Sequence, residues 1–301
     1  GENLNYTVAA IRLAKKANAV SRLHGEVARG MWRPYGLDKK IFHITNAQHP
    51  GFWTDPELKK AFLKENVRAF RKRKAMLKKD LFDLVLDQTG KLFDPEVLTI
   101  VWARRFAGYK RADLLLHDFP RFTELIRRAD RPVQIIWAGK SYPEDYHAIN
   151  IFNRLVEVSK EFPNLAVLTG YEMNLSKMLK CGSDVWLNTP RITREASGTS
   201  GMTAAMNGSL NLTANDGWIP EFARHGENAF VLPEVDVRID QWSPWLTRSE
   251  YKRYFAGMVR KKLFPLQVEG RVGEEQPLYR GRFVPDPTDR EFVFNSMHAT
   301  P

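Results

Sequence analysis

Cysteine is almost absent from this chain of 301 residues, which contains Cys181 alone. A single cysteine excludes an intrachain disulfide and a cysteine-based zinc site, and we expect no metal centre. No apolar run is long enough to cross a bilayer, and the first residues lack the basic-then-apolar order of a secretion signal. We therefore expect a globular protein of the reducing cytoplasm that has no membrane partner.

Acidic residues are too few to balance the basic ones: 35 Asp and Glu stand against 46 Lys and Arg, a net charge of +11. Much of the excess lies in residues 59–79, where apolar side chains recur at roughly helical spacing. We interpret this segment as a helix with a solvated basic face. Binding of nucleic acid or another polyanion is the alternative, but the sequence has no recognisable nucleic-acid-binding module.

Strands and helices alternate with short connections from residue 95 onward. Buried-type strands are predicted at residues 97–103, 133–138, 165–168, 185–188, 209–213 and 229–232. Helices are predicted between them, at about 112–129, 145–162, 175–182 and up to residue 207. This alternation predicts an α/β fold, a doubly wound parallel sheet with helices on both faces. Ligands bind beyond the carboxyl ends of such strands, so we expect the site in the loops that follow them.

The first 94 residues and the last 69 follow other patterns. The former predict a helix over residues 4–32, a strand at 41–44, and a helix that begins at 54–57 and continues toward 85. The latter predict one helix, at 249–263, and otherwise irregular structure. We therefore divide the chain into residues 1–94, 95–232 and 233–301. The chain begins with Gly1 and not with Met, and residues 5–7 have the pattern of a helix entered from a preceding context, so we expect that an upstream part is missing.

Two loops at the predicted carboxyl edge of the sheet have the composition of an anion site. Residues 195–203 (EASGTSGMT) place small residues before a helix, so that backbone N–H groups can approach a phosphate, and Glu195 can bind sugar hydroxyls. The first strand is followed by four cations, Arg104, Arg105, Lys110 and Arg111. Together the loops predict a phosphate site, with a basic surface turn as the alternative.

Several motifs in the same order resemble those of the α-glucan (glycogen/starch) phosphorylases, above all their shorter bacterial branch. They are residues 103–111, the Ala-Gly-Lys turn at 138–140, Tyr171 with residues 173–175, the approach to the glutamate loop at 184–190, and the histidine-bearing helix at 18–26. The resemblance extends from about residue 3 to residue 232.

The resemblance implies a fold and a reaction. Residues 95–232 would form the second Rossmann domain of a two-domain, GT-B-type glycosyltransferase, and residues 1–94 the closing helices of the first. The reaction would be phosphorolysis of an α-1,4-glucan by inorganic phosphate, which yields glucose 1-phosphate with retention. Pyridoxal phosphate would be the cofactor and would act through its phosphate group. No oligomeric state is implied.

The resemblance also assigns roles to individual residues. Arg105 and Lys110 would hold the substrate and cofactor phosphates, while Glu195 and His24 would contact the sugar from opposite walls. The catalytic residues would thus be Arg105, Lys110, Glu195 and His24. The cofactor would be held by Arg104, Lys110, Tyr171, Gly198, Thr199, Ser200, Gly201 and Thr203. The sugar would be bound by His24, Glu195, Ala196, Ser197 and Gly198.

Thr203 departs from the family pattern, because it stands where the family has the lysine that binds pyridoxal phosphate as a Schiff base. Threonine has no amine, and the nearest lysines, Lys177 and Lys180, belong to the preceding helix and are poorly placed substitutes. Three hypotheses follow. The chain uses pyridoxal phosphate held non-covalently; or it is a nucleotide-sugar glucan synthase, a class with a similar Arg, Lys and Glu but an acid at position 203; or it binds glucan without catalysis.

Overall fold

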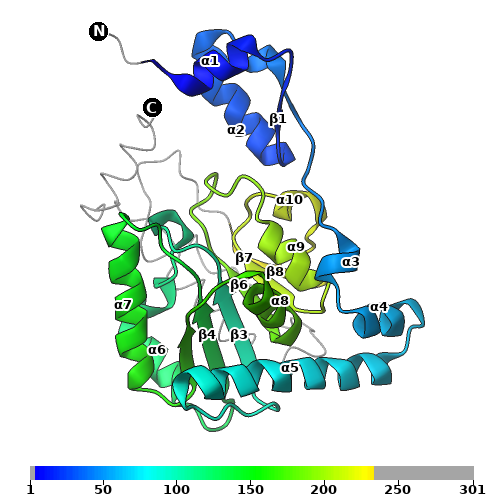
Figure 1. The fold of residues 1–301 in the computed structure, drawn as a ribbon, viewed down its shortest axis with the longest axis vertical. Coiled ribbons are helices and arrows are strands. Elements are labelled where there is room, and N and C mark those ends of the chain that lie inside the picture. The colour runs from blue at the N-terminus through cyan, green and yellow to red at the C-terminus, as the bar shows by residue number, and fades with distance from the viewer. Residues whose placement is uncertain (1–3, 234–301) are drawn as a thin grey trace, which may run out of the picture.

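The computed structural model describes residues 4–233, and its centre is a six-stranded parallel sheet (Figure 1). The order of the strands is β5-β4-β3-β6-β7-β8. They are β3 (Leu98–Ala103), β4 (Val133–Ala138), β5 (Leu165–Leu168), β6 (Val185–Asn188), β7 (Leu210–Thr213) and β8 (Ala229–Val231). These bounds agree closely with the predicted strands, and the predicted doubly wound α/β sheet is confirmed.

The order of the strands reverses between β3 and β6. From β3 the chain moves outward to β4 and β5, then returns to place β6 on the other side of β3. In doubly wound sheets this reversal separates the two loops that leave the central strands, and ligands bind in the crevice between them. The loops after β3 and β6 carry Arg104 and Glu195, so the topology itself directs both residues to one place.

Helices cover both faces of the sheet. One face packs against α6 (Phe119–Ile126) and α7 (Tyr146–Lys160). The other packs against α5 (Val67–Thr89), α8 (Met173–Gly182) and α9 (Thr199–Ala205). Figure 1 shows α6 and α7 together on one side and the long α5 on the other. The strands are therefore buried on both sides, which explains their continuous apolar composition.

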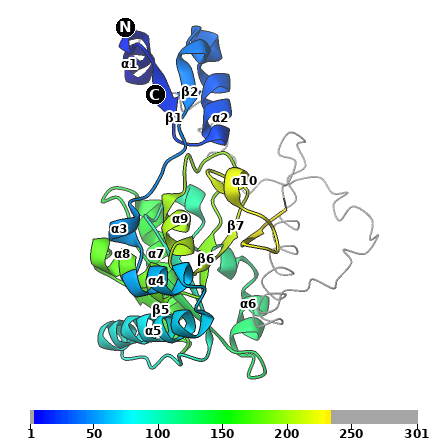
Figure 2. The same cartoon turned by 90° about the vertical axis from the view of Figure 1, so that its right-hand side faces the viewer.

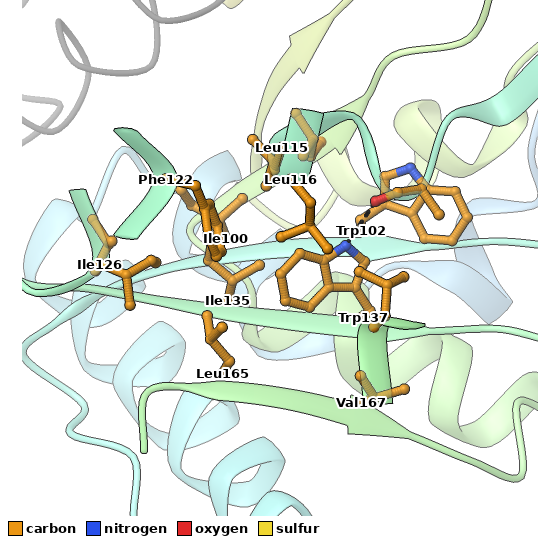
Figure 3. Close-up of a cluster of buried hydrophobic side chains, with 14 of the residues drawn as sticks. Ile100, Trp102, Leu115, Leu116, Phe122, Ile126, Ile135, Trp137, Leu165 and Val167 are labelled. Carbon is orange, nitrogen blue, oxygen red and sulfur yellow. Dashed lines mark hydrogen bonds between the residues drawn. The ribbon is translucent and has the colours of Figure 1, made fainter. Parts of the chain in front are cut away.

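Large aromatic side chains fill the core between the sheet and the α6–α7 layer (Figure 3). Trp102 and Trp137 are almost fully buried, and the Trp137 indole N–H donates to the Ala112 carbonyl at 3.0 Å. The Phe106 ring packs against Trp102 in a tilted arrangement, with 4.9 Å between the ring centroids. Side chains of this kind each stabilise the fold by about 1.5–3 kcal/mol on burial. This core holds the carboxyl end of β3, and hence the start of the basic loop, in place.

The predicted basic helix is not continuous. The chain forms α4 (Pro56–Leu63) and then α5, separated by a turn in which Glu65 has φ of +50° and Asn66 caps the new helix. The interpretation of its basic face as solvated is wrong for two lysines. Lys74 donates to the carbonyls of Cys181 and Asn207, and Lys78 pairs with Asp184 at 2.6 Å. These lysines fasten α5 to the sheet.

The predicted single helix over residues 4–32 is also wrong. It is interrupted by β1 (Ala17–Ala19), so that α1 (Tyr6–Leu13) and α2 (Arg22–Trp32) are separate helices. The reason is tertiary: β1 pairs in parallel with β2 (Ile41–His43). The Ser21 side chain then accepts the His24 amide proton and begins α2. Short 3-10 turns, η1 (Arg33–Tyr35) and η2 (Asp38–Lys40), lead to β2.

The remaining helices are short. The predicted helix over 112–129 is a 3-10 turn, η4 (Leu114–Asp118), followed by α6, because Pro120 has no amide proton and Asp118 caps a new helix. The others are η3 (Gly108–Lys110), α3 (Pro50–Trp53) and α10 (Ile219–Phe222). Within residues 4–233 no helix has the length and apolar character needed to cross a membrane.

Residues 4–46 form a small unit that stands above α10 at the carboxyl edge of the sheet (Figure 2). Hydrogen bonds from Ser21, Arg22 and Thr45 join this unit to the loops at the edge of the sheet, and they are described with the site below. The proposed division at residues 94 and 95 stays a prediction. The predicted helix at 249–263, and the whole segment 234–301, lie outside the described residues.

Candidate active site

Three charged side chains from the two central loops meet at the switch between β3 and β6. Lys110 Nζ lies 2.8 Å and 3.1 Å from the two carboxylate oxygens of Glu195, and Arg104 Nη1 lies 3.2 Å from one of them. Arg104 is 5% exposed and Lys110 7% exposed. The structure thus brings together three of the predicted site residues from positions about ninety residues apart.

The charges in this cluster set the protonation state of Glu195. Burial alone would raise its pKa, but the charges of Arg104 and Lys110, with a contribution from Arg105, hold the pKa of Glu195 below its ordinary value. Glu195 is therefore ionised at neutral pH. Two buried cations against one carboxylate leave one net positive charge, and an anionic ligand would complete the balance.

Two buried polar atoms beside the cluster make no hydrogen bond to the described residues. They are Arg104 Nε and Ser197 Oγ. The Arg104 guanidinium does donate to Ser200 Oγ at 2.9 Å, so it connects the basic loop to the first turn of α9. Buried donors without partners are uncommon in folded proteins, and here they lie next to the excess positive charge. Their position is consistent with a ligand that accepts hydrogen bonds.

The glutamate loop is held by Asp216, which was not predicted as a site residue. Its carboxylate accepts the backbone N–H groups of Arg194, Glu195 and Gly217 at 2.9–3.1 Å. Burial, assisted by the charge of Glu195, raises the pKa of Asp216 to about 6. The available signal was its place in the loop after β7, at the same edge of the sheet.

Glycines let the glutamate loop turn closely. Gly198 has φ of +80° and precedes α9, while Gly217 has φ of +61°. A Cβ at Gly217 would lie 2.3 Å from the Ser197 carbonyl oxygen, and one at Gly201 would lie 2.6 Å from Asn211 Oδ1. The carbonyl of Ala196 faces the N-terminal unit and accepts a hydrogen bond from Ser21. The backbone of the glutamate loop thus packs closely against Gly217 on one side and accepts a hydrogen bond from the N-terminal unit on the other.

The wall that carries His24 is attached directly to this loop. The Ser21 hydroxyl that caps α2 donates to the Ala196 carbonyl at 2.7 Å, and Glu221 accepts the Arg22 amide proton and the Thr45 hydroxyl proton. His24 Nδ1 accepts the Val20 amide proton at 3.1 Å, and burial lowers the pKa of this imidazole. The neutral ring therefore carries its proton on Nε2, as a donor.

Tyr171 and Thr203 lie behind the cluster. The Tyr171 hydroxyl lies 3.2 Å from both the Ala103 carbonyl and Ser176 Oγ, and burial raises its pKa. Thr203 is buried in α9, where its hydroxyl donates to the carbonyls of Thr199 and Ser200. Its hydroxyl proton is thus used within the first turn of α9.

The two other cations of the basic loop behave differently from Arg104 and Lys110. Arg111 donates to the Thr189 and Pro190 carbonyls at 2.7 Å and 2.9 Å, and so ties the basic loop to the glutamate loop. Arg105 is exposed, and no hydrogen bond or ion pair joins it to the described residues. Arg104 occupies the buried position by Glu195 instead, while the predicted phosphate-binding role of Arg105 stays a prediction.

Several known proteins are similar to this chain in sequence. Residues 56–232 match the model of the family described as carbohydrate phosphorylase. A glycogen phosphorylase of Mycobacterium tuberculosis is 34% identical over 77% of this chain and 32% of its own length. A maltodextrin phosphorylase of Thermococcus litoralis is 34% identical over 79% of this chain and 33% of its own length.

An uncharacterized protein of Methanocaldococcus jannaschii is 49% identical over 77% of this chain and 44% of its own length. The chain therefore spans less than half of each of these relatives. The family match covers more than half of this chain and agrees with the motifs that carried the resemblance. The chain belongs to the carbohydrate phosphorylase family.

Proposed function

We propose that this chain contributes the phosphate- and glucosyl-binding half of an α-glucan phosphorylase. The complete protein would cleave an α-1,4-glucan with inorganic phosphate and release glucose 1-phosphate with retention. The observation that carries the proposal is the buried cluster of Arg104, Lys110 and Glu195, which has one excess positive charge at the switch between β3 and β6.

Each residue of the cluster would act through a group that the structure positions. Arg104 and Lys110 would neutralise phosphate charge as fixed donors inside the fold, which is worth more than the same contact in water. Glu195 would accept hydrogen bonds from sugar hydroxyls. His24 would donate its Nε2 proton to the sugar from the attached N-terminal wall. The Asp216 contacts would keep the Glu195 backbone in place.

Pyridoxal phosphate fits this site in part. When bound, it would supply a phosphate group beside the substrate phosphate. The unpartnered Arg104 Nε and Ser197 Oγ are donors suited to phosphate oxygens. Covalent attachment at position 203 does not fit, because Thr203 has no amine and is buried within α9. We therefore assign the phosphate contacts to Arg104, Lys110 and the start of α9, and no bond to Thr203.

A nucleotide-sugar synthase is the weaker candidate. In that class the acid at position 203 would bind the ribose, and Thr203 already donates its hydroxyl proton to its own helix. A relative that binds glucan without catalysis is the other candidate. Its only support is that position 203 lacks the lysine amine of the family. The buried cations around Glu195 argue against the candidate without catalysis, whereas the synthase shares that pattern and is weaker only because position 203 has no acid.

The experiment uses the full-length protein with maltoheptaose. One arm contains inorganic phosphate and added pyridoxal phosphate, a second contains a nucleotide-linked glucose, and a third measures glucan binding alone. The proposal expects glucose 1-phosphate in the first arm. Transfer only from the nucleotide sugar, or binding without any product, would contradict it and support the corresponding alternative.

A further inference from the structure

Among the described residues, Lys180 has fewer hydrogen-bond partners for its amine than Lys74, which also lacks a carboxylate partner but donates to two carbonyls and to Ser209 Oγ. Lys78 is paired with Asp184 and Lys110 with Glu195, each at 2.6–2.8 Å. Lys180 is only 4% exposed, yet no carboxylate pairs with it. Its Nζ donates one hydrogen bond, to Ser176 Oγ at 2.8 Å. An ammonium has three protons to donate, so this one is poorly compensated for burial.

An aromatic ring supplies the rest of the local environment. Nζ of Lys180 lies 3.9 Å from the centroid of the Trp53 ring. The Trp53 carbonyl accepts from Asn207 Nδ2, which also donates to the Thr203 carbonyl in the preceding turn of α9. Trp53 thus contacts Lys180 of α8 through its ring and Asn207, just after the end of α9, through its carbonyl, and Asn207 in turn contacts Thr203.

A second set of contacts joins Lys180 to the candidate active site. Ser176 Oγ, its hydrogen-bond partner, is also 3.2 Å from the Tyr171 hydroxyl. That hydroxyl donates to the carbonyl of Ala103, the residue that precedes Arg104. The positive charge of Arg104 acts on Lys180 as well. The amine is thus connected to the cluster by a path of three hydrogen bonds, which ends at Ala103, and by one electrostatic interaction with Arg104.

This environment favours the uncharged, nucleophilic form of the amine. Burial, together with the charge of Arg104, lowers the pKa of Lys180 to about 8, although the nearby Cys181 opposes the change. A substantial share of the amine is then neutral in weakly alkaline solution, where an ordinary lysine is protonated. Lysines that attack carbonyl groups in enzymes are activated in the same way, because burial or a neighbouring cation lowers the pKa of the amine.

We propose that Lys180 provides the amine that Thr203 lacks and binds the aldehyde of pyridoxal phosphate covalently, a proposal that rests on the proposed function for its choice of aldehyde. The neutral amine attacks the aldehyde carbon and a carbon–nitrogen bond forms. The aldehyde oxygen leaves as water with the two amine protons, and a carbon–nitrogen double bond remains. No oxidant or reductant takes part. The phosphate of the same molecule would be bound by Arg104.

The test traps that bond and locates it. The full-length protein is incubated with one equivalent of pyridoxal phosphate at about pH 8, near the pKa of Lys180. Borohydride then reduces the double bond, and peptide mass spectrometry identifies the modified lysine. We expect the label on Lys180, with a stoichiometry near one and with competition by inorganic phosphate.

Lys177 provides a matched control. It lies one turn earlier on α8, with its amine 5.3 Å from the Phe52 ring centroid, and it is less buried. Lys177→Arg should leave the label unchanged, whereas Lys180→Arg should reduce it at least about tenfold, because an arginine cannot form this bond. Thermal unfolding of both variants checks that they fold. If Lys180→Arg does not fold, the peptide map of the unaltered protein still decides.

The outcomes separate this inference from the proposed function. A label on Lys180 without any glucose 1-phosphate supports the inference and contradicts the proposed function. Glucose 1-phosphate production with the label on another lysine, or with cofactor bound but never trapped, overturns the inference and leaves the proposed function standing. No label and no cofactor binding overturns it too, and Lys180 would then be a cation that only packs on Trp53.

Discussion

Replacing Glu195 by glutamine would remove the one carboxylate that compensates two buried cations. Its oxygens lie 2.8 Å from Lys110 Nζ and 3.2 Å from Arg104 Nη1. At an effective dielectric constant of about 20, each contact contributes roughly 5 kcal/mol of Coulomb attraction, which the cost of desolvation largely offsets. Removing one partner of a buried pair typically costs about 3–5 kcal/mol. Glutamine keeps one acceptor oxygen, so we expect about 3 kcal/mol.

The assay is denaturant unfolding of the variant with and without inorganic phosphate. Glu195→Gln raises the net charge of the cluster from one positive charge to two, so phosphate should stabilise the variant more than the unaltered protein. At a phosphate concentration one hundred times the dissociation constant, binding adds about 2.7 kcal/mol to the free energy of unfolding.

Glu157→Gln is the matched control. Glu157 pairs with Lys160 at 2.7 Å on the exposed side of α7, where both side chains are more than 60% accessible. An exposed pair of this kind contributes no more than about 0.5 kcal/mol. The reasoning is refuted if Glu195→Gln costs as little as Glu157→Gln, or if phosphate stabilises the unaltered protein and not the variant.

Three further predictions concern the support of the site. The pKa of Asp216 is about 6 in the folded protein, against an ordinary value of 3.8, so the folded state binds the proton more tightly than the unfolded state does. Stability should fall by about 3 kcal/mol between about pH 4 and pH 6, and Asp216→Asn should remove this component; parallel pH profiles of unfolding free energy would contradict it. Glu221→Ala removes two hydrogen bonds to the segment that carries His24 and should raise the KM for glucan about fivefold, the equivalent of about 1 kcal/mol; an unchanged KM in steady-state assays would contradict it. Gly217→Ala places a Cβ 2.3 Å from the Ser197 carbonyl at φ of +61° and should cost about 1–3 kcal/mol, read as a lower melting temperature; an unchanged melting temperature would contradict it.

The strands were predictable because each is a short apolar run, bounded by polar or turn-forming residues and buried on both faces. The helices of the first 94 residues were less predictable. The break at Glu65 depends on one residue with positive φ, and the break at Ala17 depends on pairing with β2, more than twenty residues away. Helical spacing contains neither kind of information.

The choice between Arg104 and Arg105 shows what sequence leaves open at the site. The ladder between β3 and β4 continues past the assigned strand, since the amides of Arg104 and Phe106 bond to the carbonyls of Ala138 and Lys140. The chain bends at Arg104, so its guanidinium reaches Glu195 and Ser200. Phe106 packs in the core beside α6 and α7, and Arg105 between them is exposed. Tertiary contacts with the glutamate loop and α9 therefore decide which arginine is buried.

Asp216 was missed, and Lys180 was judged a poorly placed substitute, for a related reason. Asp216 acts through backbone N–H groups, which any sequence supplies, so its partners leave no pattern. Lys180 is buried because α8 packs between the sheet and Trp53, which belongs to a segment far away in the chain. In both cases the sequence shows which residue is present, but the groups that surround it are brought there by tertiary packing.

The central claim is that the cluster of Arg104, Lys110 and Glu195 handles phosphate during glucosyl transfer. The most direct test is the rate of glucose 1-phosphate release from maltoheptaose by the full-length protein and two variants, Lys110→Met and Lys140→Met. Lys140 follows the neighbouring strand β4 and is 54% exposed, beside Glu172. The account predicts release by the unaltered protein and by Lys140→Met, and a loss of at least about a hundredfold in Lys110→Met. Equal rates in the two variants, or no release by the unaltered protein, would contradict it.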